Sequence, residues 1–192
     1  MEYYALNQYL KDTFGEKVYK IALDGGFTCP NRDGTLGTGG CIFCSGQGSG
    51  DFAQCRTLSV TEQLARGKEQ IAQKYRGAKY IAYFQAFTNT YAPAEQLRAL
   101  YEEALSDAQV AALSIATRPD CLPDEVIALL KELNKRKPVW VELGLQTIHE
   151  KTARYIRRGY ALAVYDEAVR KLKEAGLQVI VHVILGLPYE TK

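Results

Sequence analysis

The sequence predicts an α/β fold in which parallel strands alternate with helices and the sheet curves into part of a barrel. Two observations carry this prediction. Short apolar runs alternate along the chain with longer segments whose apolar residues recur at helical spacing. The runs are also nearly uninterrupted, which is typical of strands in a parallel sheet covered by helices. Right-handed crossovers wind such units in one sense. We therefore expect the chemistry at the carboxyl ends of the strands.

The expected elements follow one another without a linker or an internal repeat. The predicted strands cover residues 18–23, 80–84, 111–116, 139–143 and 179–185. The predicted helices lie near residues 4–10, 60–75, 93–104, 123–133, 152–156 and 165–172. Ser59 or Thr61 can cap the second helix, Pro93 suits a first helical position, and Gly176 ends the last helix.

The composition is that of one globular domain spanning residues 1–192. Of these residues, 47% are hydrophobic and 24% are charged, which excludes disorder, collagen and a disulfide-rich miniprotein. A net charge of +2 argues against an obligate nucleic-acid binder with a basic face, but it is compatible with an RNA substrate held by a few local contacts. No apolar run reaches the roughly 20 residues of a transmembrane helix, and the start does not resemble a signal peptide. We expect a cytoplasmic protein that does not bind a membrane.

Three of the five cysteines lie in the glycine-rich loop after the first predicted strand. Cys29 precedes a C-x2-C pair formed by Cys41 and Cys44, and the glycines of the loop let the backbone turn tightly around a bound centre. Cytosolic cysteines are more often ligands or redox groups than disulfides. The pattern fits a dithiol made of Cys41 and Cys44, or a zinc site closed by Cys55 or a distant histidine. It also fits an iron–sulfur cluster that leaves one iron open to an exogenous ligand.

The residues around these cysteines resemble those of radical S-adenosylmethionine (radical SAM) enzymes. The resemblance is carried by residues 28–35, by Gly39-Gly40-Cys41, and by the aromatic Phe43 just before Cys44. The eleven residues between Cys29 and Cys41 exceed the common C-x3-C-x2-C spacing, and a widened gap is typical of the branch that contains the elongator catalytic subunit. Over nearly the whole chain the sequence is similar to the uncharacterised bacterial YhcC-like family. The resemblance implies that Cys29, Cys41 and Cys44 hold a [4Fe–4S] cluster whose fourth iron binds SAM.

The same resemblance implies cofactor contacts near other strand ends. The implied residues are Phe43, Gln85, Thr117, Gln146, Arg158 and His182. Gln85 belongs to a segment that offers backbone carbonyls to the methionine amino group. A contact that a glutamate makes in some relatives is either lost here, because Ala116 stands in its place, or moved to Thr117. Gln146 and Arg158 approach the sulfonium and carboxylate end, where a guanidinium pairs well with a carboxylate. His182 takes a place near the adenosine ribose, and the alternative is a satisfied core histidine.

The function implied by the resemblance is the generation of a 5′-deoxyadenosyl radical that abstracts hydrogen from a substrate. An electron donor such as flavodoxin or ferredoxin is expected to reduce the cluster. Kinship with the elongator and tRNA-thiolation branches suggests RNA as the substrate. The alternatives are a binding module stabilised by zinc or a cluster, and a dithiol oxidoreductase.

The resemblance also implies a partial (β/α)6 TIM-like barrel. Five strands are predicted, and no predicted helix follows residues 179–185. Relatives close six strands and continue into a C-terminal region that shapes the substrate pocket. We therefore expect a radical SAM core domain that is truncated after the fifth strand and leaves an exposed apolar edge there.

Overall fold

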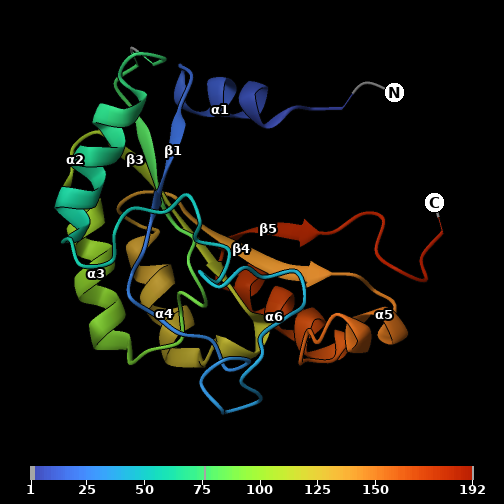
Figure 1. Cartoon of the computed structure of the whole chain (residues 1–192). Coiled ribbons are helices and arrows are strands. Elements are labelled where there is room, and N and C mark those ends of the chain that lie inside the picture. Colours follow the sequence, from blue (N-terminus) through green and yellow to red (C-terminus); the bar gives the residue numbers. More distant parts are fainter. Residues whose placement is uncertain (1–2, 76, 192) are drawn as a thin grey trace.

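A five-stranded parallel sheet forms the centre of the computed structural model, which describes residues 3–75 and 77–191 (Figure 1). Its strands are β1 (Tyr19–Leu23), β2 (Tyr80–Phe84), β3 (Val110–Thr117), β4 (Val139–Gln146) and β5 (Gln178–Val183). They are neighbours in the order β1-β2-β3-β4-β5, and every neighbouring pair is parallel. The predicted α/β fold is confirmed. Strands that follow in chain order wind the sheet in one direction, as a partial barrel requires.

Helices precede the first strand and connect each strand to the next. They are α1 (Leu6–Phe14), α2 (Val60–Ile71), α3 (Ala94–Ser106), α4 (Asp124–Leu133), α5 (Glu150–Tyr155) and α6 (Leu162–Glu174), with a short 3-10 turn, η1 (Pro119–Cys121), after β3. Pro93 lies one position before its helix because its backbone is still extended, with ψ of 141°. The fifth strand is shorter than predicted and ends at Val183. No helix in the described part of the chain has the length and apolar character needed to cross a membrane.

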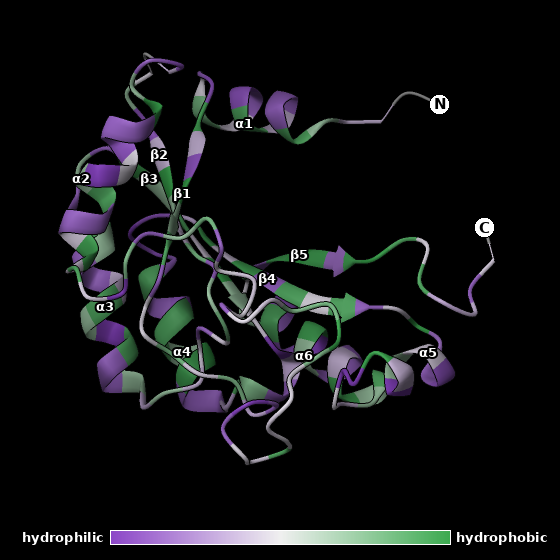
Figure 2. Ribbon diagram, viewed as in Figure 1, coloured by the Kyte–Doolittle hydropathy of each residue, from purple (hydrophilic) through white to green (hydrophobic). Residues whose placement is uncertain are grey.

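The outer face of the sheet carries the main hydrophobic core. Leu23, Phe84, Ile115 and Val141 are fully buried on this face and belong to one cluster with residues of α2, α3, α4 and α6. Figure 2 shows strands with mixed hydrophobic and hydrophilic positions, and hydrophilic ribbon on the outward side of α2. Burying each such side chain stabilises the fold by roughly 1.5–3 kcal/mol.

The inner face of the sheet is covered by α1 near the amino ends of the strands. Leu10 of α1 packs there with Ile81, Ala112 and Trp140 in a second, smaller apolar cluster. Successive strand residues point to opposite faces, so Ile81 and Trp140 face α1 while their neighbours join the main core. Nearer the carboxyl ends the inner face is open, and the residues predicted to act in chemistry lie there.

β5 forms one edge of the sheet and is only partly covered. Val181 and Val183 are 48% and 54% exposed, and Leu185 just beyond the strand is 89% exposed. The exposed apolar edge expected at the fifth strand is therefore present. The truncation itself stays a prediction.

The amino end of α2 shows how a local sequence signal sets a boundary in this fold. The Ser59 hydroxyl accepts a hydrogen bond from the Glu62 amide at 3.2 Å, and the Glu62 carboxylate accepts one from the Ser59 amide at 2.8 Å. This reciprocal pair is a capping box, and it satisfies amides that the first turn of a helix leaves without partners. Ser59, rather than Thr61, is the N-cap.

We expect Ser59→Ala to lower the free energy of unfolding by about 1 kcal/mol, because the cap is lost while the packing of α2 is unchanged. Urea denaturation of the variant and the wild type measures this difference. Ser106→Ala is the matched control, since the Ser106 hydroxyl donates only to the Glu103 carbonyl at the exposed end of α3. An equal loss in both variants would contradict the capping role.

Candidate functional site

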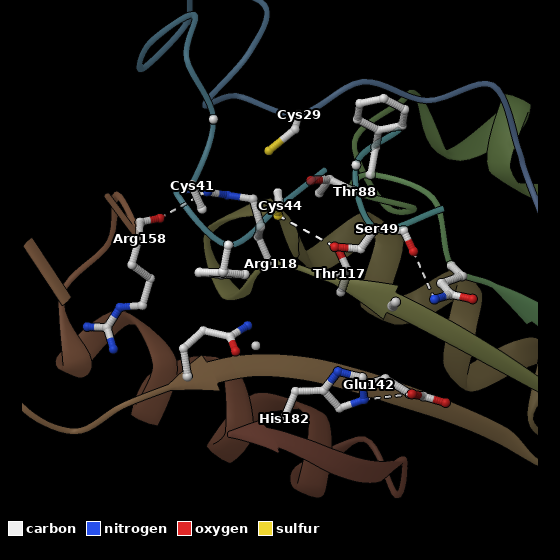
Figure 3. A pocket seen from close by; sticks show the side chains of 18 of the residues that line it. Cys29, Cys41, Cys44, Ser49, Thr88, Thr117, Arg118, Glu142, Arg158 and His182 are labelled. Atoms are coloured by element: carbon white, nitrogen blue, oxygen red, sulfur yellow. Dashed lines mark hydrogen bonds and ion pairs between the residues drawn. The ribbon is translucent and has the colours of Figure 1, made fainter. Parts of the chain in front are cut away.

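The carboxyl ends of the strands surround one cavity of about 190 Å³ (Figure 3). Every residue predicted to bind the cluster or SAM lines it, namely Cys29, Cys41, Phe43, Cys44, Gln85, Thr117, Gln146, Arg158 and His182. These residues come from the loop after β1, the ends of β2, β3 and β4, the strand β5, and the loop between α5 and α6. The fold thus brings the predicted residues to one place, while their individual roles stay predictions.

The cysteine loop is folded against itself by Arg32. The Arg32 amide donates to the carbonyl of Cys29 at 2.8 Å. Its guanidinium donates to the carbonyls of Cys44 at 3.3 Å and Ser45 at 2.6 Å. Gly40, at φ of 69°, gives this guanidinium room, because a Cβ at Gly40 would lie 2.8 Å from the Arg32 Nε. Arg32 therefore fixes the position of Cys44 relative to Cys29.

The thiols of Cys41 and Cys44 interact with each other and with nearby donors. The proximity of the two thiols lowers the pKa of Cys44 to about 6 and raises the pKa of Cys41, and burial raises the pKa of Cys41 further. The Asn31 amide donates to the Cys41 sulfur at 3.2 Å, and the Ser49 hydroxyl donates to the Cys44 sulfur at 3.6 Å. Such donors favour the thiolate, which is the form that binds metals.

A polar layer lies across the inner face of the sheet at the side of the cavity opposite the cysteines (Figure 3). It contains one residue from each strand: Lys20, Tyr83, Ser114, Glu142 and His182. The Glu142 carboxylate accepts hydrogen bonds from Lys20 and Ser114 on one oxygen, and from the His182 Nε2 at 2.7 Å on the other. The Lys20 ammonium also lies 4.3 Å from the centre of the Tyr83 ring. One carboxylate thus joins β1, β3, β4 and β5, and Lys20 links β2 to them through the Tyr83 ring.

Glu142 stays ionised in this layer although its side chain is only 3% exposed. Burial by itself raises the pKa of the carboxyl, but the hydrogen bond from His182 and the charge and hydrogen bond of Lys20 outweigh it and lower the pKa to about 2. Burial and the nearby Glu142 charge raise the pKa of Tyr83. An ionised carboxylate can only accept hydrogen bonds, so His182 donates to Glu142 through Nε2.

Gln85, Thr117 and Gln146 occupy the rim of the cavity at the ends of β2, β3 and β4. The Gln85 amide donates to the Ser49 carbonyl at 2.8 Å, which joins this strand end to the cysteine loop. Thr117 is buried and shares a 2.6 Å hydrogen bond with the Thr90 hydroxyl. Gln146 has φ of 63°, where the register between β4 and β5 shifts. A positive φ in a residue other than glycine is strained, and such residues concentrate at functional sites.

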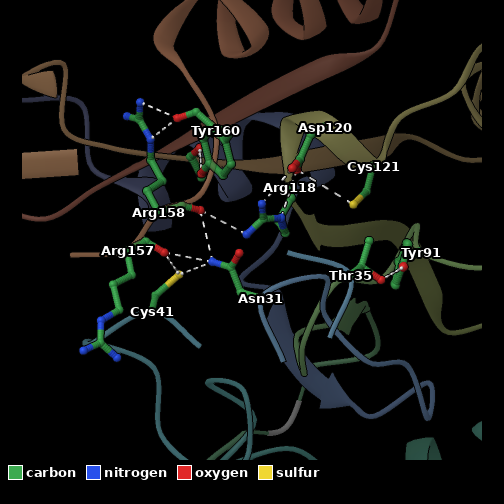
Figure 4. A network of polar contacts seen from close by, with 11 residues as sticks. Asn31, Thr35, Cys41, Tyr91, Arg118, Asp120, Cys121, Arg157, Arg158 and Tyr160 are labelled. Carbon is green, nitrogen blue, oxygen red and sulfur yellow. Dashed lines mark hydrogen bonds and ion pairs between the residues drawn. The ribbon is translucent and has the colours of Figure 1, made fainter. Parts of the chain in front are cut away.

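Arg158 is 1% exposed, and its guanidinium is directed at backbone carbonyls (Figure 4). It donates to the carbonyls of Leu145 at 2.9 Å, Thr147 at 2.6 Å and Tyr160 at 2.9 Å. These contacts fasten the loop between α5 and α6 to the end of β4. The guanidinium of Arg158 thus already donates to backbone carbonyls. Its pairing with a cofactor carboxylate stays a prediction.

Arg118 and Tyr160 also line the cavity, although neither was assigned a role from the sequence. The Arg118 guanidinium donates to Asp120 at 2.9 and 2.7 Å and to the Arg158 carbonyl at 3.1 Å, and it lies 4.9 Å from the centre of the Tyr160 ring. The Arg-x-Asp spacing directly after a predicted strand is a signal that could have identified Arg118. Tyr160 carries no comparable signal, since its hydroxyl donates to the Gly144 carbonyl, 16 residues away in the sequence.

The chemistry of the donor set fits a cluster held by three thiolates. Cys29, Cys41 and Cys44 are all partly buried along one cavity wall, and Arg32 and Arg118 line the same cavity with positive charge that offsets thiolate charge. Thiolates are the usual ligands of iron–sulfur clusters. Within residues 3–75 and 77–191, no three His, Cys, Asp or Glu side chains come close enough to hold a single metal ion. A cluster of several iron atoms is wider than one ion, so this last finding concerns mononuclear sites alone.

Comparisons with known proteins agree on one family. The family model described as the radical SAM superfamily matches residues 30–192, so the match begins directly after Cys29. The chain is 54% identical over 190 residues to the uncharacterized protein YtqA of Bacillus subtilis, covering 99% of the chain and 59% of YtqA. It is 46% identical over 178 residues to the protein YhcC of Escherichia coli, covering 92% of the chain and 56% of YhcC. The chain thus spans less than two thirds of the length of these relatives.

A solved structure shares the fold. It is the archaeal Elp3 of Methanocaldococcus infernus with an N-terminal deletion, which superposes with a TM-score of 0.60 at 20% sequence identity. The superposition covers 91% of this chain and 39% of the Elp3 chain. At this identity the likeness shows the α/β fold and nothing of the substrate.

Glu142 gives the site a measurable pH dependence of stability. The folded-state pKa of about 2 lies below the ordinary value of 4.5, so the stabilisation is complete above about pH 5 and is lost as the pH falls towards 2. A shift of this size corresponds to ~3 kcal/mol. We expect Glu142→Gln to lower the free energy of unfolding by about this amount at pH 7, and we expect the difference from the wild type to shrink as the pH falls to 3.

Urea denaturation at pH 7, 5 and 3 measures this effect. Glu167→Gln is the control, because Glu167 is an exposed carboxylate paired with Arg170 on the outside of α6. Exposed pairs contribute little to stability, so this variant should follow the wild type at each pH. A pH-independent difference between Glu142→Gln and the wild type would contradict the role assigned to the carboxylate.

Proposed function

The chain belongs to the radical SAM superfamily, and from this premise we propose that it is the cofactor-binding core of an enzyme that cleaves SAM reductively and abstracts hydrogen from a substrate. The observation that carries the proposal is the single cavity lined by Cys29, Cys41 and Cys44 together with the strand-end residues of β2 to β5. The superfamily implies a [4Fe–4S] cluster and SAM as cofactors. A parallel fold with its polar residues gathered at the strand ends is suited to hold both.

In this proposal Cys29, Cys41 and Cys44 hold the cluster. When bound and reduced, the cluster supplies one electron that breaks a carbon–sulfur bond of SAM and leaves a 5′-deoxyadenosyl radical. Arg118 brings a fixed positive charge to the cavity, because Asp120 holds its guanidinium in one orientation. Thr117 and Gln85, on the rim, are proposed to contact SAM.

On the side of the cavity opposite the cysteines, the polar layer favours a ligand group that can form hydrogen bonds. Glu142 holds the Nε2 of His182, which leaves Nδ1 as the ring nitrogen available to a ligand. A hydroxyl group such as that of the adenosine ribose is the ligand we propose for it. Arg158 keeps the loop between α5 and α6 in place, so that this loop covers the cysteine side of the site.

We propose a one-electron donor such as flavodoxin or ferredoxin, since SAM cleavage consumes an electron. An RNA substrate is suggested by the resemblance to the elongator-like branch, and the net charge of +2 adds no support.

We expect Cys29→Ala, Cys41→Ala and Cys44→Ala each to prevent cluster assembly, because each removes a thiolate ligand. Anaerobic reconstitution followed by iron and sulfide analysis measures this. Cys55→Ala is the matched control, since the exposed Cys55 does not line the cavity and should leave the iron content unchanged. Unchanged activity of Cys29→Ala would favour the dithiol alternative. Zinc instead of iron in the wild type would favour the zinc alternative.

We expect the reconstituted wild type to release 5′-deoxyadenosine when dithionite and SAM are added, and Cys41→Ala to lower the rate by at least about 100-fold. Loss of groups that merely surround a metal ligand already costs about 10–100-fold, so loss of a ligand should cost at least as much. Chromatography of the quenched reaction measures the product. The proposed enzyme function would be overturned if the cluster-loaded wild type released no more 5′-deoxyadenosine than Cys41→Ala.

A further inference from the structure

Asn31 lies directly against one of the proposed cluster ligands (Figure 4). Its side-chain amide donates to the Cys41 sulfur at 3.2 Å. The same nitrogen lies 2.9 Å from the Arg157 carbonyl and 3.2 Å from the Arg158 carbonyl. Asn31 is 7% exposed, so water does not compete strongly for these contacts.

The orientation of the Asn31 amide follows from its surroundings. All three groups around its nitrogen are acceptors, and the reverse orientation would place the amide oxygen against two carbonyl oxygens. On the other side of the amide, Gly159 has φ of 86°, and a Cβ there would lie 2.6 Å from the Asn31 Oδ1. The amide is therefore held with its N–H groups towards the sulfur.

The contact changes when Cys41 becomes a ligand. As a thiol, Cys41 donates its own hydrogen to the Arg157 carbonyl at 3.3 Å. A metal ligand is deprotonated, so this donation is lost and the sulfur can only accept. Among the described side chains, Asn31 is the hydrogen-bond donor to this sulfur. A hydrogen bond to a charged acceptor is roughly twice as strong as one between neutral groups.

We propose that Asn31 raises the reduction potential of the cluster through this hydrogen bond, and that it thereby makes the cluster accessible to a weaker electron donor. Reduction adds one electron to the cluster and increases the negative charge on its sulfur ligands. A fixed N–H donor favours the more negative state, and hydrogen bonds to sulfur are among the factors that set such potentials. The inference rests on the proposed function, because it requires that Cys41 ligates a cluster.

The test is Asn31→Leu, which keeps a side chain of similar size and removes the donor. Wild type and variant are reconstituted anaerobically, and the midpoint potential is measured by a redox titration followed by electron paramagnetic resonance. We expect the variant to bind as much iron and sulfide as the wild type. We expect its reduction equilibrium constant to fall about tenfold, which is ~59 mV for a one-electron couple.

Two further variants separate tuning from a merely structural effect. Gly159→Ala displaces the Asn31 amide without deleting it and should shift the potential in the same direction by a smaller amount. Ser49→Ala removes the donor to the Cys44 sulfur, but that contact is 3.6 Å long and Ser49 is exposed. The reduction equilibrium constant of this variant should therefore fall by less than about threefold.

The outcomes are distinct. A cluster-loaded Asn31→Leu with the wild-type potential overturns the inference, and so does a folded variant that binds no iron, because Asn31 would then only position Cys41. If Asn31→Leu does not fold, Gly159→Ala decides by the same criterion of potential at wild-type iron content. A wild type that assembles no cluster would instead overturn the proposed function.

Discussion

The buried Glu142 carboxylate is the interaction on which the shape of this protein depends. A charge that is 3% exposed is tolerated only when its partners replace water, and here Lys20, Ser114 and His182 satisfy both oxygens. Lys20 belongs to β1 and His182 to β5, which are the two edges of the sheet. His182 lies on the strand next to β4, whereas Lys20 lies three strands away and reaches the carboxylate only because the sheet curves. The charge and the curvature therefore support each other.

The inner face of the curved sheet has three layers between the amino ends and the carboxyl ends of its strands. Apolar residues of α1 fill the end near the amino ends of the strands, the polar layer lies beyond them, and the cysteine loop covers the carboxyl ends. A ligand entering the cavity meets thiols on one side and the Glu142–His182 pair on the other (Figure 3). The apolar cluster under the polar layer explains why chemistry is confined to one end of the fold.

Several of the side chains that hold the loops around the cavity donate to backbone carbonyls. Arg158 fastens β4 to the loop before α6, Arg118 and Asn31 both hold the Arg158 carbonyl, and Arg32 closes the cysteine loop. Gln146 is held at positive φ within this framework. Strain of this kind persists only where surrounding contacts determine the backbone, and it places the strand end at the rim of the cavity.

The sequence by itself determined the order of strands and helices along the chain and the three cysteines of one loop, because periodicity and motif spacing are local properties of the chain. The strand-end residues that line the cavity were implied by the resemblance to radical SAM enzymes. Only the tertiary structure decided the contacts of Arg158 with backbone carbonyls and the roles open to Arg118 and Asn31. The Lys20–Glu142 pair joins residues 122 positions apart, and Asn31 meets a carbonyl 127 positions away. Such partners are chosen by the packing of the curved sheet and its loops, and no local pattern in the sequence encodes them.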